Sequence, residues 1–309
     1  MEKHAFGRTD MQVSKLGFGS YKMSGKPGGS TVEEVGRLLG SALDNGLNVI
    51  DTAECYGQGE ELLGQAIGHR RNDYYLFTKC GHAAGLDQPD WSPRLLEASI
   101  ERSLRSLQTD YLDLIQLHSC RTHLLKRGEV IEVLQRARDA GKVRYIGYSG
   151  DGRPATYAVQ CGAFDTLQIS VNIADQEALQ RILPLARARQ MGIIAKRSLA
   201  DIAWQSDPAS TDYCEQRYRK RLQALNYPFL QSASSLIVDT ALRFTLSVPE
   251  VDIVLVGGTN PLHWQHNLEL AAAGSLPPQQ FEALRQRWRA LTWWRRPLQG
   301  ADLGWHGCV

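Results

Sequence analysis

The sequence lacks the features that would place the protein in a membrane or direct its export. Its 309 residues contain no stretch near the roughly 18 uninterrupted apolar residues of a membrane-spanning helix. The opening residues, MEKHAFGRTDMQ, have no apolar core of a secretory signal. None of the six cysteines belongs to a C-x-x-C pair, so we expect reduced thiols. The sequence therefore predicts a cytoplasmic protein.

The chain also lacks a marked excess of either charge. It has 35 lysines and arginines against 33 acidic residues, and no long basic stripe. Binding to nucleic acid or to a membrane surface therefore has no electrostatic support. No short-period repeat and no low-complexity tract is present. A hydrophobic share of 43% fits one sizeable core, so we expect a single domain over residues 1–309.

Short β-rich runs alternate with amphipathic segments along most of the chain. The strand candidates are residues 16–20, 48–51, 74–79, 111–118, 143–149, 166–171, 192–196 and 251–256. Helical patterns cover 31–45, 60–68, a segment that opens at Ser92-Pro93, 129–140, 175–189, 235–245, 262–272 and 279–291. Eight such units favour an α/β fold closed into a (β/α)₈ TIM barrel. We expect residues 200–231 to form a long loop on the catalytic face and 292–309 to form a C-terminal tail over it.

Three consecutive predicted strands end in an ionisable residue. Asp51 ends the second strand, Lys79 the third and His118 the fourth, and Tyr56 lies on the loop after Asp51. The C-terminal strand ends of such a barrel face the active site. Each residue alone is more often a solvated or structural group. Four polar side chains gathered at one barrel mouth indicate a shared role.

These four side chains suit hydride chemistry at a carbonyl group. A nearby ammonium lowers the pKa of a phenol, so Lys79 would make Tyr56 a general acid–base near neutral pH. Asp51 would hold Lys79 in place. His118 can hydrogen-bond a carbonyl oxygen as negative charge develops on it. No side chain supplies a hydride, so a cofactor is required.

Four segments resemble the signatures of the aldo-keto reductase family, in the family's order. They are DTAECYG around Asp51 and Tyr56, FTK at Lys79, DLIQLH at His118, and GKVRYIGYSG. The resemblance extends from about residue 15 to residue 267. It implies an NAD(P)(H)-dependent oxidoreductase that interconverts an aldehyde or ketone with an alcohol. In this scheme Tyr56 is the proton donor and His118 orients the carbonyl.

The resemblance also implies a cofactor site, with departures from the family pattern. Gly150 stands where the family has asparagine, and Lys196 stands where it has a tyrosine that stacks on the nicotinamide. The stem of Lys196 could cover the ring, and Arg197 could meet a phosphate. The residues expected to bind cofactor are Gly19, Ser20, Tyr21, Ser149, Gln168, Lys196, Arg197, Leu199, Gly257, Gly258, Thr259, His263 and Asn267.

The segment VLVGGTNPLHWQHN resembles the family's phosphate-binding turn. Gly257 and Gly258 permit close backbone approach, and a helix N-terminus favours an anion. The lysine and arginine that often hold the 2′-phosphate align with Gly257 and His263. NADP(H) is the first expectation from the family, and NAD(H) is the alternative.

Substrate contacts are expected from four tryptophans, Trp91, Trp293, Trp294 and Trp305. The last three belong to the tail, which shapes the substrate pocket in the resembled family. The polar character of several loops favours a sugar or another hydroxylated carbonyl compound. The sequence does not indicate an oligomeric state.

Two further functions stay open at this stage. The resembled family also contains barrels that act as channel-associated subunits, and turnover of NADPH with aldehydes would separate them from an enzyme. A barrel lyase or hydrolase could instead use Lys79 as a Schiff-base nucleophile, which leaves Tyr56 and Asp51 without a purpose. No metal site is expected, because His263 and His266 have no third ligand at a suitable spacing.

Three cysteines, Cys55, Cys80 and Cys120, each lie within two residues of a catalytic candidate. A thiol pKa lowered by Lys79 would make them oxidisable. Strand alternation favours the other interpretation, in which Cys80 points away from Lys79 into the layer between barrel and helices.

Overall fold

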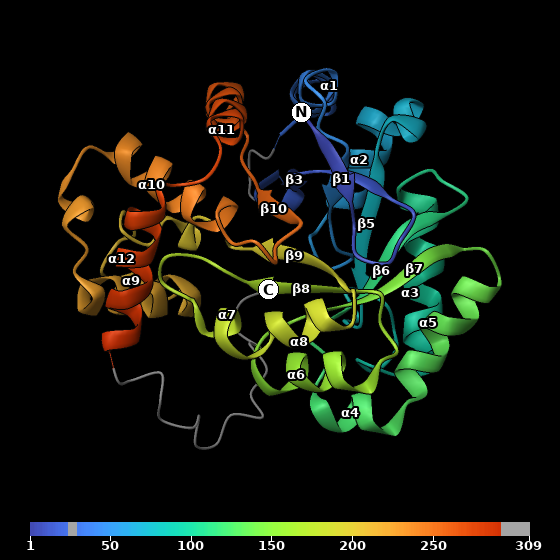
Figure 1. The fold of residues 1–309 in the computed structure, drawn as a ribbon. Helices are drawn as coiled ribbons and strands as arrows, with labels where there is room; N and C mark the ends of the chain where they lie inside the picture. Colours follow the sequence, from blue (N-terminus) through green and yellow to red (C-terminus); the bar gives the residue numbers. More distant parts are fainter. Residues whose placement is uncertain (24–29, 292–309) are drawn as a thin grey trace.

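The computed structural model describes residues 1–23 and 30–291. Eight parallel strands close into a barrel in the order β10-β3-β4-β5-β6-β7-β8-β9, with helices around it (Figure 1). The strands are β3 (Leu16–Gly19), β4 (Val49–Asp51), β5 (Tyr75–Cys80), β6 (Leu112–His118), β7 (Val143–Ser149), β8 (Thr166–Ser170), β9 (Gly192–Lys196) and β10 (Ile253–Val256). This topology confirms the predicted (β/α)₈ barrel.

The helices begin where the sequence supplies capping residues. Thr31 and Glu34 form a capping box at the start of α1, and Ser92 caps α3 by accepting a hydrogen bond from the amide of Leu95. The longer helices are α1 (Val32–Asp44), α2 (Gly59–Ile67), α3 (Pro93–Ser106), α5 (Glu129–Asp139), α6 (Gly152–Cys161), α9 (Tyr213–Leu225), α10 (Ser234–Leu246), α11 (Pro261–Ala273) and α12 (Pro278–Ala290). The shorter ones are α4 (Thr122–Arg127), α7 (Glu177–Arg181) and α8 (Leu183–Ala188). None of the described helices combines the length and apolar character needed to cross a membrane.

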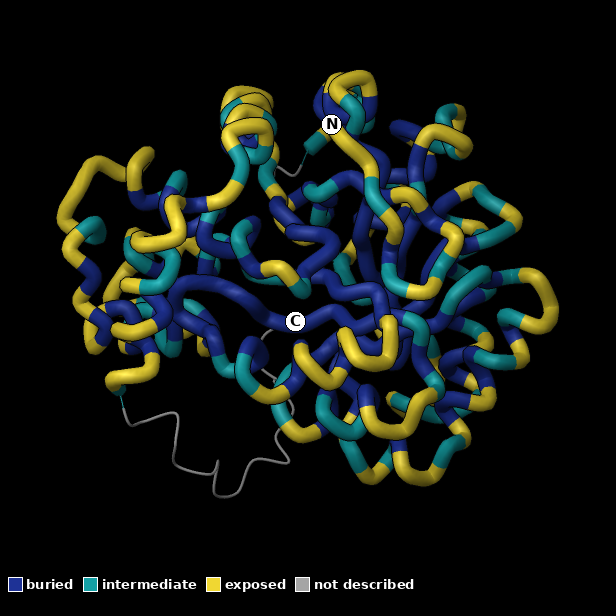
Figure 2. Tube along the Cα trace, viewed as in Figure 1, coloured by how far each residue is buried: buried dark blue, intermediate teal, exposed yellow. Residues whose placement is uncertain are grey.

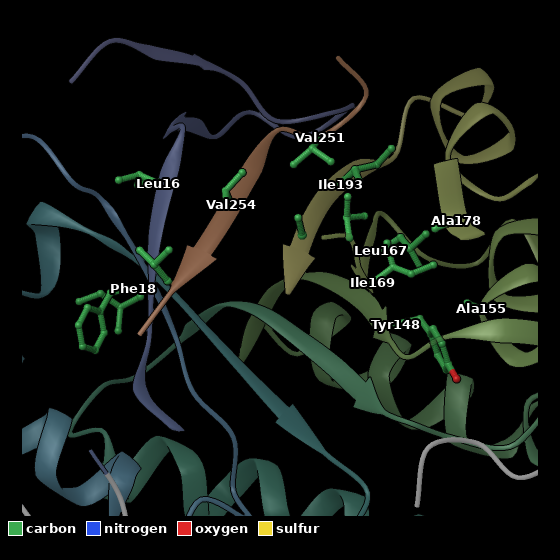
Figure 3. Packing of buried hydrophobic residues seen from close by; sticks show 14 of the residues in the cluster. Leu16, Phe18, Tyr148, Ala155, Leu167, Ile169, Ala178, Ile193, Val251 and Val254 are labelled. Carbon is green, nitrogen blue, oxygen red and sulfur yellow. The ribbon is translucent and has the colours of Figure 1, made fainter. Parts of the chain in front are cut away.

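The apolar core has two layers, one on each side of the barrel wall. Side chains between strands and helices form the larger layer, part of which is seen in Figure 3, where Phe18 on β3, Val254 on β10 and Leu167 on β8 are labelled. A smaller cluster fills the barrel interior and includes Phe77 and Ile194. Figure 2 shows the resulting pattern, with buried strands inside and exposed outer faces on the helices. Strands covered on both sides read as nearly continuous apolar runs, which made them recognisable in the sequence.

A hairpin of β1 (Lys3–Ala5) and β2 (Gln12–Ser14), absent from the sequence-based prediction, closes one end of the barrel. Phe6 from its turn stacks on Phe77 in the interior, with ring centroids 5.9 Å apart. The amide of Gln12 donates a hydrogen bond to the hydroxyl of Tyr75, at the start of β5. Because these contacts lie at the N-terminal ends of the strands, the opposite end carries the open face.

The segment 200–231 contains more regular structure than predicted. It holds α9 and two 3₁₀ turns, Ala200–Ile202 and Pro228–Gln231, so the prediction of a loop is wrong over these residues. Asp212 caps α9, and buried Tyr218, Leu222 and Leu225 form a narrow stripe on it. The polar composition of the rest of the helix concealed that stripe. Helices α4 and α6 were also missed, because one is short and the other contains glycine and proline in its first turn.

Candidate active site

A cavity of about 470 Å³ lies at the C-terminal ends of the barrel strands. Strand ends supply Gly19, Asp51, His118, Lys196 and Val256 to its wall, the middle of β8 supplies Gln168, and the loop after β4 supplies Tyr56. The segment after β9 covers another side through residues that include Arg197, Leu199 and Asp201. The structure therefore brings most of the predicted catalytic group to one hollow.

Lys79 lies at the centre of this group, and its side chain is only 1% exposed. Its Nζ donates to Oδ1 of Asp51 at 2.5 Å and to the carbonyl of Thr52 at 2.7 Å. The other oxygen of Asp51 accepts from Nε2 of Gln168 at 2.8 Å and from Nε2 of Gln116 at 3.3 Å. Burial by itself would lower the pKa of Lys79, but the Asp51 carboxylate together with Tyr56 outweighs it and the pKa is raised. Lys79 is thus a fixed buried cation.

Tyr56 lies beside this cation and faces two other rings. Its ring centroid is 5.2 Å from Nζ of Lys79, 5.9 Å from the ring of His118 and 5.1 Å from the ring of Tyr21. Burial raises the pKa of Tyr56, while Lys79 opposes the rise only in part. The predicted net lowering of this pKa is therefore wrong for the protein alone, because loss of hydration disfavours the phenolate more than one ammonium favours it.

His118 is buried at the end of β6, with 5% exposure. Burial and then the positive charge of Lys79 hold its pKa well below the usual value, so the ring is neutral at physiological pH. Nδ1 of His118 lies 3.4 Å from Sγ of Cys55. The backbone carbonyl of His118 lies 3.1 Å from Nε2 of His82, which fixes the neighbouring loop. A neutral imidazole can donate one hydrogen bond to a ligand but offers it no positive charge.

Glu54 is a buried carboxyl that sequence reasoning missed. Its oxygens contact the hydroxyl of Ser99 on α3 and accept from the amide of His82 at 2.8 Å. Burial raises its pKa to about 8. It ties the loop that carries Tyr56 to the segments that follow β5. No motif marks this role, because a glutamate on a loop is usually solvated.

Glu54→Gln is expected to flatten the pH dependence of folding stability between about pH 5 and pH 8. An unfolded glutamate titrates near pH ~4.3, so in this range the folded chain keeps a proton that the unfolded chain releases. The free energy of unfolding of the parent protein therefore falls as pH rises, by about 1.4 kcal/mol per pH unit for one fully linked proton. Urea unfolding at three pH values measures this slope. Exposed Glu61→Gln is the matched control, and equal slopes in parent and Glu54→Gln would contradict the prediction.

Polar side chains at the ends of β7, β8 and β9 are linked to one another. Ser149 donates from Oγ to Oε1 of Gln168 at 2.9 Å. Asp151 accepts from the amide and hydroxyl of Ser170 at 2.8 and 3.1 Å, and it lies 3.3 Å from Nζ of Lys196. Burial lowers the pKa of Lys196 to about 8, against the opposing effect of Asp151. Asp151, missed in the sequence, is thus the counterion of the lysine that replaces the family's aromatic residue.

Gly150 precedes this counterion, and a side chain could not be placed there. A Cβ at this position would lie 2.5 Å from the hydroxyl of Tyr148. That hydroxyl donates to the carbonyl of Cys120 at 2.9 Å, so the tyrosine is held in place. The departure from the family's asparagine follows from this packing.

Arg197 is occupied by two carboxylates. Its guanidinium lies 3.7 Å from Asp151 and 3.5 Å from Asp201, and it donates to Oγ of Ser170 at 3.2 Å. A phosphate at this residue would compete with those contacts. Leu199, two residues later, lines the cavity as predicted.

The turn between β10 and α11 contributes to the cavity and also to a second hollow of about 1680 Å³, which α1 and α11 line. Gly257 lines the first hollow and Thr259 the second, while Lys22 lines both. A Cβ on Gly257 would lie 2.7 Å from the carbonyl of Gly19, so the two strands require glycine here. Figure 1 shows α1 and α11 as neighbouring helices at one edge of the molecule.

The remaining cofactor candidates are distributed around this turn. Asn267 is buried within α11, with 6% exposure, whereas His263 is exposed on the same helix. Ser20 is buried between two cavity-lining residues, Gly19 and Tyr21. Its hydroxyl has no hydrogen-bond partner among the described residues. A ligand in the cavity could satisfy it.

The tryptophans do not line the cavity in the part of the chain that is described. Trp91 packs edge-on against His82, with ring centroids 5.2 Å apart, and its amide donates to the carbonyl of Gly81 at 3.0 Å. It therefore supports the loop behind His118. Trp293, Trp294 and Trp305 lie outside the described residues.

The cysteines near the site are not activated thiols. Burial raises the pKa of Cys55 and of Cys120 to about 12, and it also raises that of Cys80, so the hypothesis of lowered thiol pKa values is wrong. Cys80 lies in the core layer between barrel and helices. Cys214 is disulfide-bonded, which corrects the expectation that all six cysteines are reduced.

Comparison with known proteins agrees with this geometry. The model of the Aldo/keto reductase family matches residues 15–289. The oxidoreductase YqkF of Bacillus subtilis is 27% identical, with 92% of this chain and 96% of that protein covered. L-galactose dehydrogenase of Arabidopsis thaliana is 26% identical, with 95% and 97% covered. The holo form of aldo-keto reductase AKR11C1 from Bacillus halodurans superposes with a TM-score of 0.77 at 25% identity, covering 93% of this chain and 96% of that one. The chain belongs to the aldo/keto reductase family.

Proposed function

We propose that the protein is an NAD(P)(H)-dependent oxidoreductase that interconverts a small aldehyde or ketone with an alcohol by hydride transfer. The observation that carries this proposal is the buried Lys79–Asp51 pair, whose ammonium lies 5.2 Å from the ring of Tyr56 inside the cavity. A carbonyl oxygen that gains negative charge needs a proton donor and a polarising group. Tyr56 and His118 line one hollow and supply both.

In carbonyl reduction Tyr56 donates its phenolic proton to the substrate oxygen. The raised pKa of Tyr56 keeps that proton on the phenol before reaction. As the phenolate forms, the Lys79 ammonium stabilises the new negative charge, and Asp51 keeps the ammonium in position. His118 donates a hydrogen bond to the same substrate oxygen. In alcohol oxidation the proton returns to Tyr56.

The residues at the mouth fit an elongated dinucleotide cofactor. When bound, nicotinamide supplies or accepts the hydride. Ser149 and Gln168 would hold its carboxamide, and the bare surface at Gly19 leaves room for a flat ring, since a Cβ there would meet nothing nearer than 3.9 Å. The turn from Gly257 to Thr259 would carry the phosphates towards the hollow between α1 and α11.

Lys22, which lines both hollows, would meet the phosphates with its ammonium. Arg37 on α1 gives the second hollow another cation. These charges support NADP(H) as the first choice, with NAD(H) as the alternative. Lys196 would lie against the nicotinamide in place of an aromatic ring.

A hydroxylated carbonyl compound such as a sugar fits the polar wall of the cavity best. Asp201, Asp212 and Glu215 line the same cavity and offer carboxylate oxygens as hydrogen-bond acceptors. The relative named L-galactose dehydrogenase supports the same substrate class.

Titration with NADPH and with NADH, followed by quenching of tryptophan fluorescence, tests the cofactor part of the proposal. We expect both to bind, with NADPH at least about tenfold tighter because a 2′-phosphate gains charge-assisted hydrogen bonds. Oxidation of the bound cofactor with a panel of aldehydes and aldoses then tests the reaction. Binding of neither dinucleotide would overturn the proposal. Tight binding without turnover on any member would favour a regulatory subunit instead.

A further inference from the structure

Cys55 lies against the ring of the proposed carbonyl-polarising residue. Its Sγ is 3.4 Å from Nδ1 of His118, within hydrogen-bond range for sulfur. In the described part of the chain, Nδ1 has no other hydrogen-bond partner, and Nε2 has none. His118 also lines the catalytic cavity. The thiol therefore occupies one ring nitrogen and leaves the other for a ligand.

A neutral imidazole exists as two tautomers, and only one of them suits the reaction. A substrate carbonyl oxygen accepts hydrogen bonds, so the ring nitrogen that meets it must carry the hydrogen. If Nδ1 carried the hydrogen, it would donate to a sulfur atom, which is a weak acceptor, and Nε2 would present a lone pair to the carbonyl. A thiol that donates to the Nδ1 lone pair gives the opposite and productive arrangement.

The geometry points to Cys55 as a positioning residue that donates its S–H to Nδ1 of His118 and so selects the Nε2–H tautomer for the carbonyl. This inference rests on the proposed function, because the tautomer matters to catalysis only if His118 polarises a substrate oxygen. It assigns Cys55 no contact with substrate and no redox step.

The surroundings of both groups agree with this assignment. The raised pKa of Cys55, caused first by burial, keeps the thiol protonated, and the lowered pKa of His118 keeps the ring neutral. The charged groups that face His118 are Lys79, Lys196 and Arg197, and His82 packs on it with ring centroids 5.5 Å apart. All of them disfavour a second proton on the ring. A ring with one proton is the state in which a neighbouring donor decides the tautomer.

The position of Cys55 is itself fixed by its neighbours. Glu54 anchors the loop to Ser99 on α3 and to the amide of His82. The amide of Tyr56 donates to the carbonyl of Ala53 at 3.0 Å, which closes a turn around Cys55. The loop thus places the thiol at His118 and the phenol of Tyr56 in the cavity together.

The test combines nitrogen NMR of the histidine rings with steady-state kinetics. In ¹⁵N-histidine-labelled protein, with His118 assigned by difference from His118→Asn, we expect a protonated Nε2 and an unprotonated Nδ1. Cys55→Ala should shift the Nδ1 and Nε2 resonances towards a mixture of tautomers. It should also lower kcat about tenfold while leaving cofactor affinity unchanged, a loss typical of one orienting hydrogen bond. Cys55→Ser keeps a hydrogen-bond donor. It should therefore restore most of the kcat and most of the parent positions of the His118 ring resonances.

Cys161→Ala, at an exposed thiol on α6, is the control and should match the parent protein in every measurement. A hydrogen on Nδ1 in the parent protein, or unchanged His118 resonances in folded Cys55→Ala, would overturn the inference. The NMR measurement needs no substrate. Failure of the proposed function would therefore appear as absent turnover in the parent protein, independently of the tautomer result.

Discussion

Replacing Tyr56 by phenylalanine is expected to lower kcat/KM for carbonyl reduction by about 10²- to 10⁴-fold, the range for loss of a positioned general acid. Phenylalanine keeps the ring that lies 5.1 Å from Tyr21 and 5.9 Å from His118, so the cavity wall should persist. Only the phenolic proton is removed. Cofactor affinity, measured by fluorescence titration, should change less than twofold because the contacts of Gln168 and Gly257 do not involve Tyr56.

Tyr213→Phe is the matched control, because Tyr213 is 55% exposed at the start of α9 and belongs to neither the proposed catalytic group nor the cofactor candidates. It should retain activity within about threefold, since surface phenol groups rarely contribute more. A Tyr56→Phe variant with near-normal turnover would remove Tyr56 as proton donor. Loss of cofactor binding in that variant would instead assign it a binding role.

The pH profile gives a second measurement on Tyr56. Because its pKa is raised above 10, the phenol holds its proton through neutral and mildly alkaline pH. Titration of Tyr56 should therefore cause no change in the rate of reduction across this pH range. The rate of alcohol oxidation should increase with pH, because that direction needs the phenolate. Tyr56→Phe should abolish the increase.

The barrel, and the placement of Asp51, Lys79 and His118 at one of its ends, could be predicted because both depend on local patterns. Asp51 and His118 end their strands and Lys79 is the penultimate residue of β5, so strand register alone brings them to one face. Tyr56 followed from its position five residues after Asp51 and from the motif DTAECYG. Sequence patterns of this kind indicate where a residue lies along a strand. In a closed parallel barrel, residues at the C-terminal ends of the strands lie at the same end of the barrel.

The parts that could not be predicted depend on contacts between distant segments. Asp151 acquires its role only when Lys196, 45 residues later in the chain, lies 3.3 Å away. Glu54 likewise contacts Ser99, which is 45 residues later in the chain. The direction of the Tyr56 pKa also depends on burial, which a charge-pair argument omits. No single-sequence pattern records how two loops pack against each other.

The tautomer of His118 also depends on a contact between distant segments of the chain. Cys55 is unremarkable in the sequence, and its thiol becomes informative only beside Nδ1. The identity of the proposed catalytic residues is thus a property of local sequence, whereas their protonation states are properties of the packed site.

Lys79→Met is expected to remove most activity and also to destabilise the fold. Loss of the ammonium takes away the charge that stabilises the phenolate of Tyr56, so kcat should fall at least about a hundredfold. Among the described residues, Asp51, which is 3% exposed, would keep only the side-chain amides of Gln168 and Gln116 as hydrogen-bond partners. Breaking a buried ion pair by removing one partner costs about 3–5 kcal/mol, which urea unfolding at pH 7 would measure.

The double variant Lys79→Met/Asp51→Asn separates these two effects. It removes the unpaired charge, so it should recover a large part of the lost stability while its kcat stays as low as that of Lys79→Met. If Lys79→Met unfolded at the parent's urea concentration, the pair would have no net structural role. Recovery of activity in the double variant would show that the ammonium serves only to neutralise Asp51.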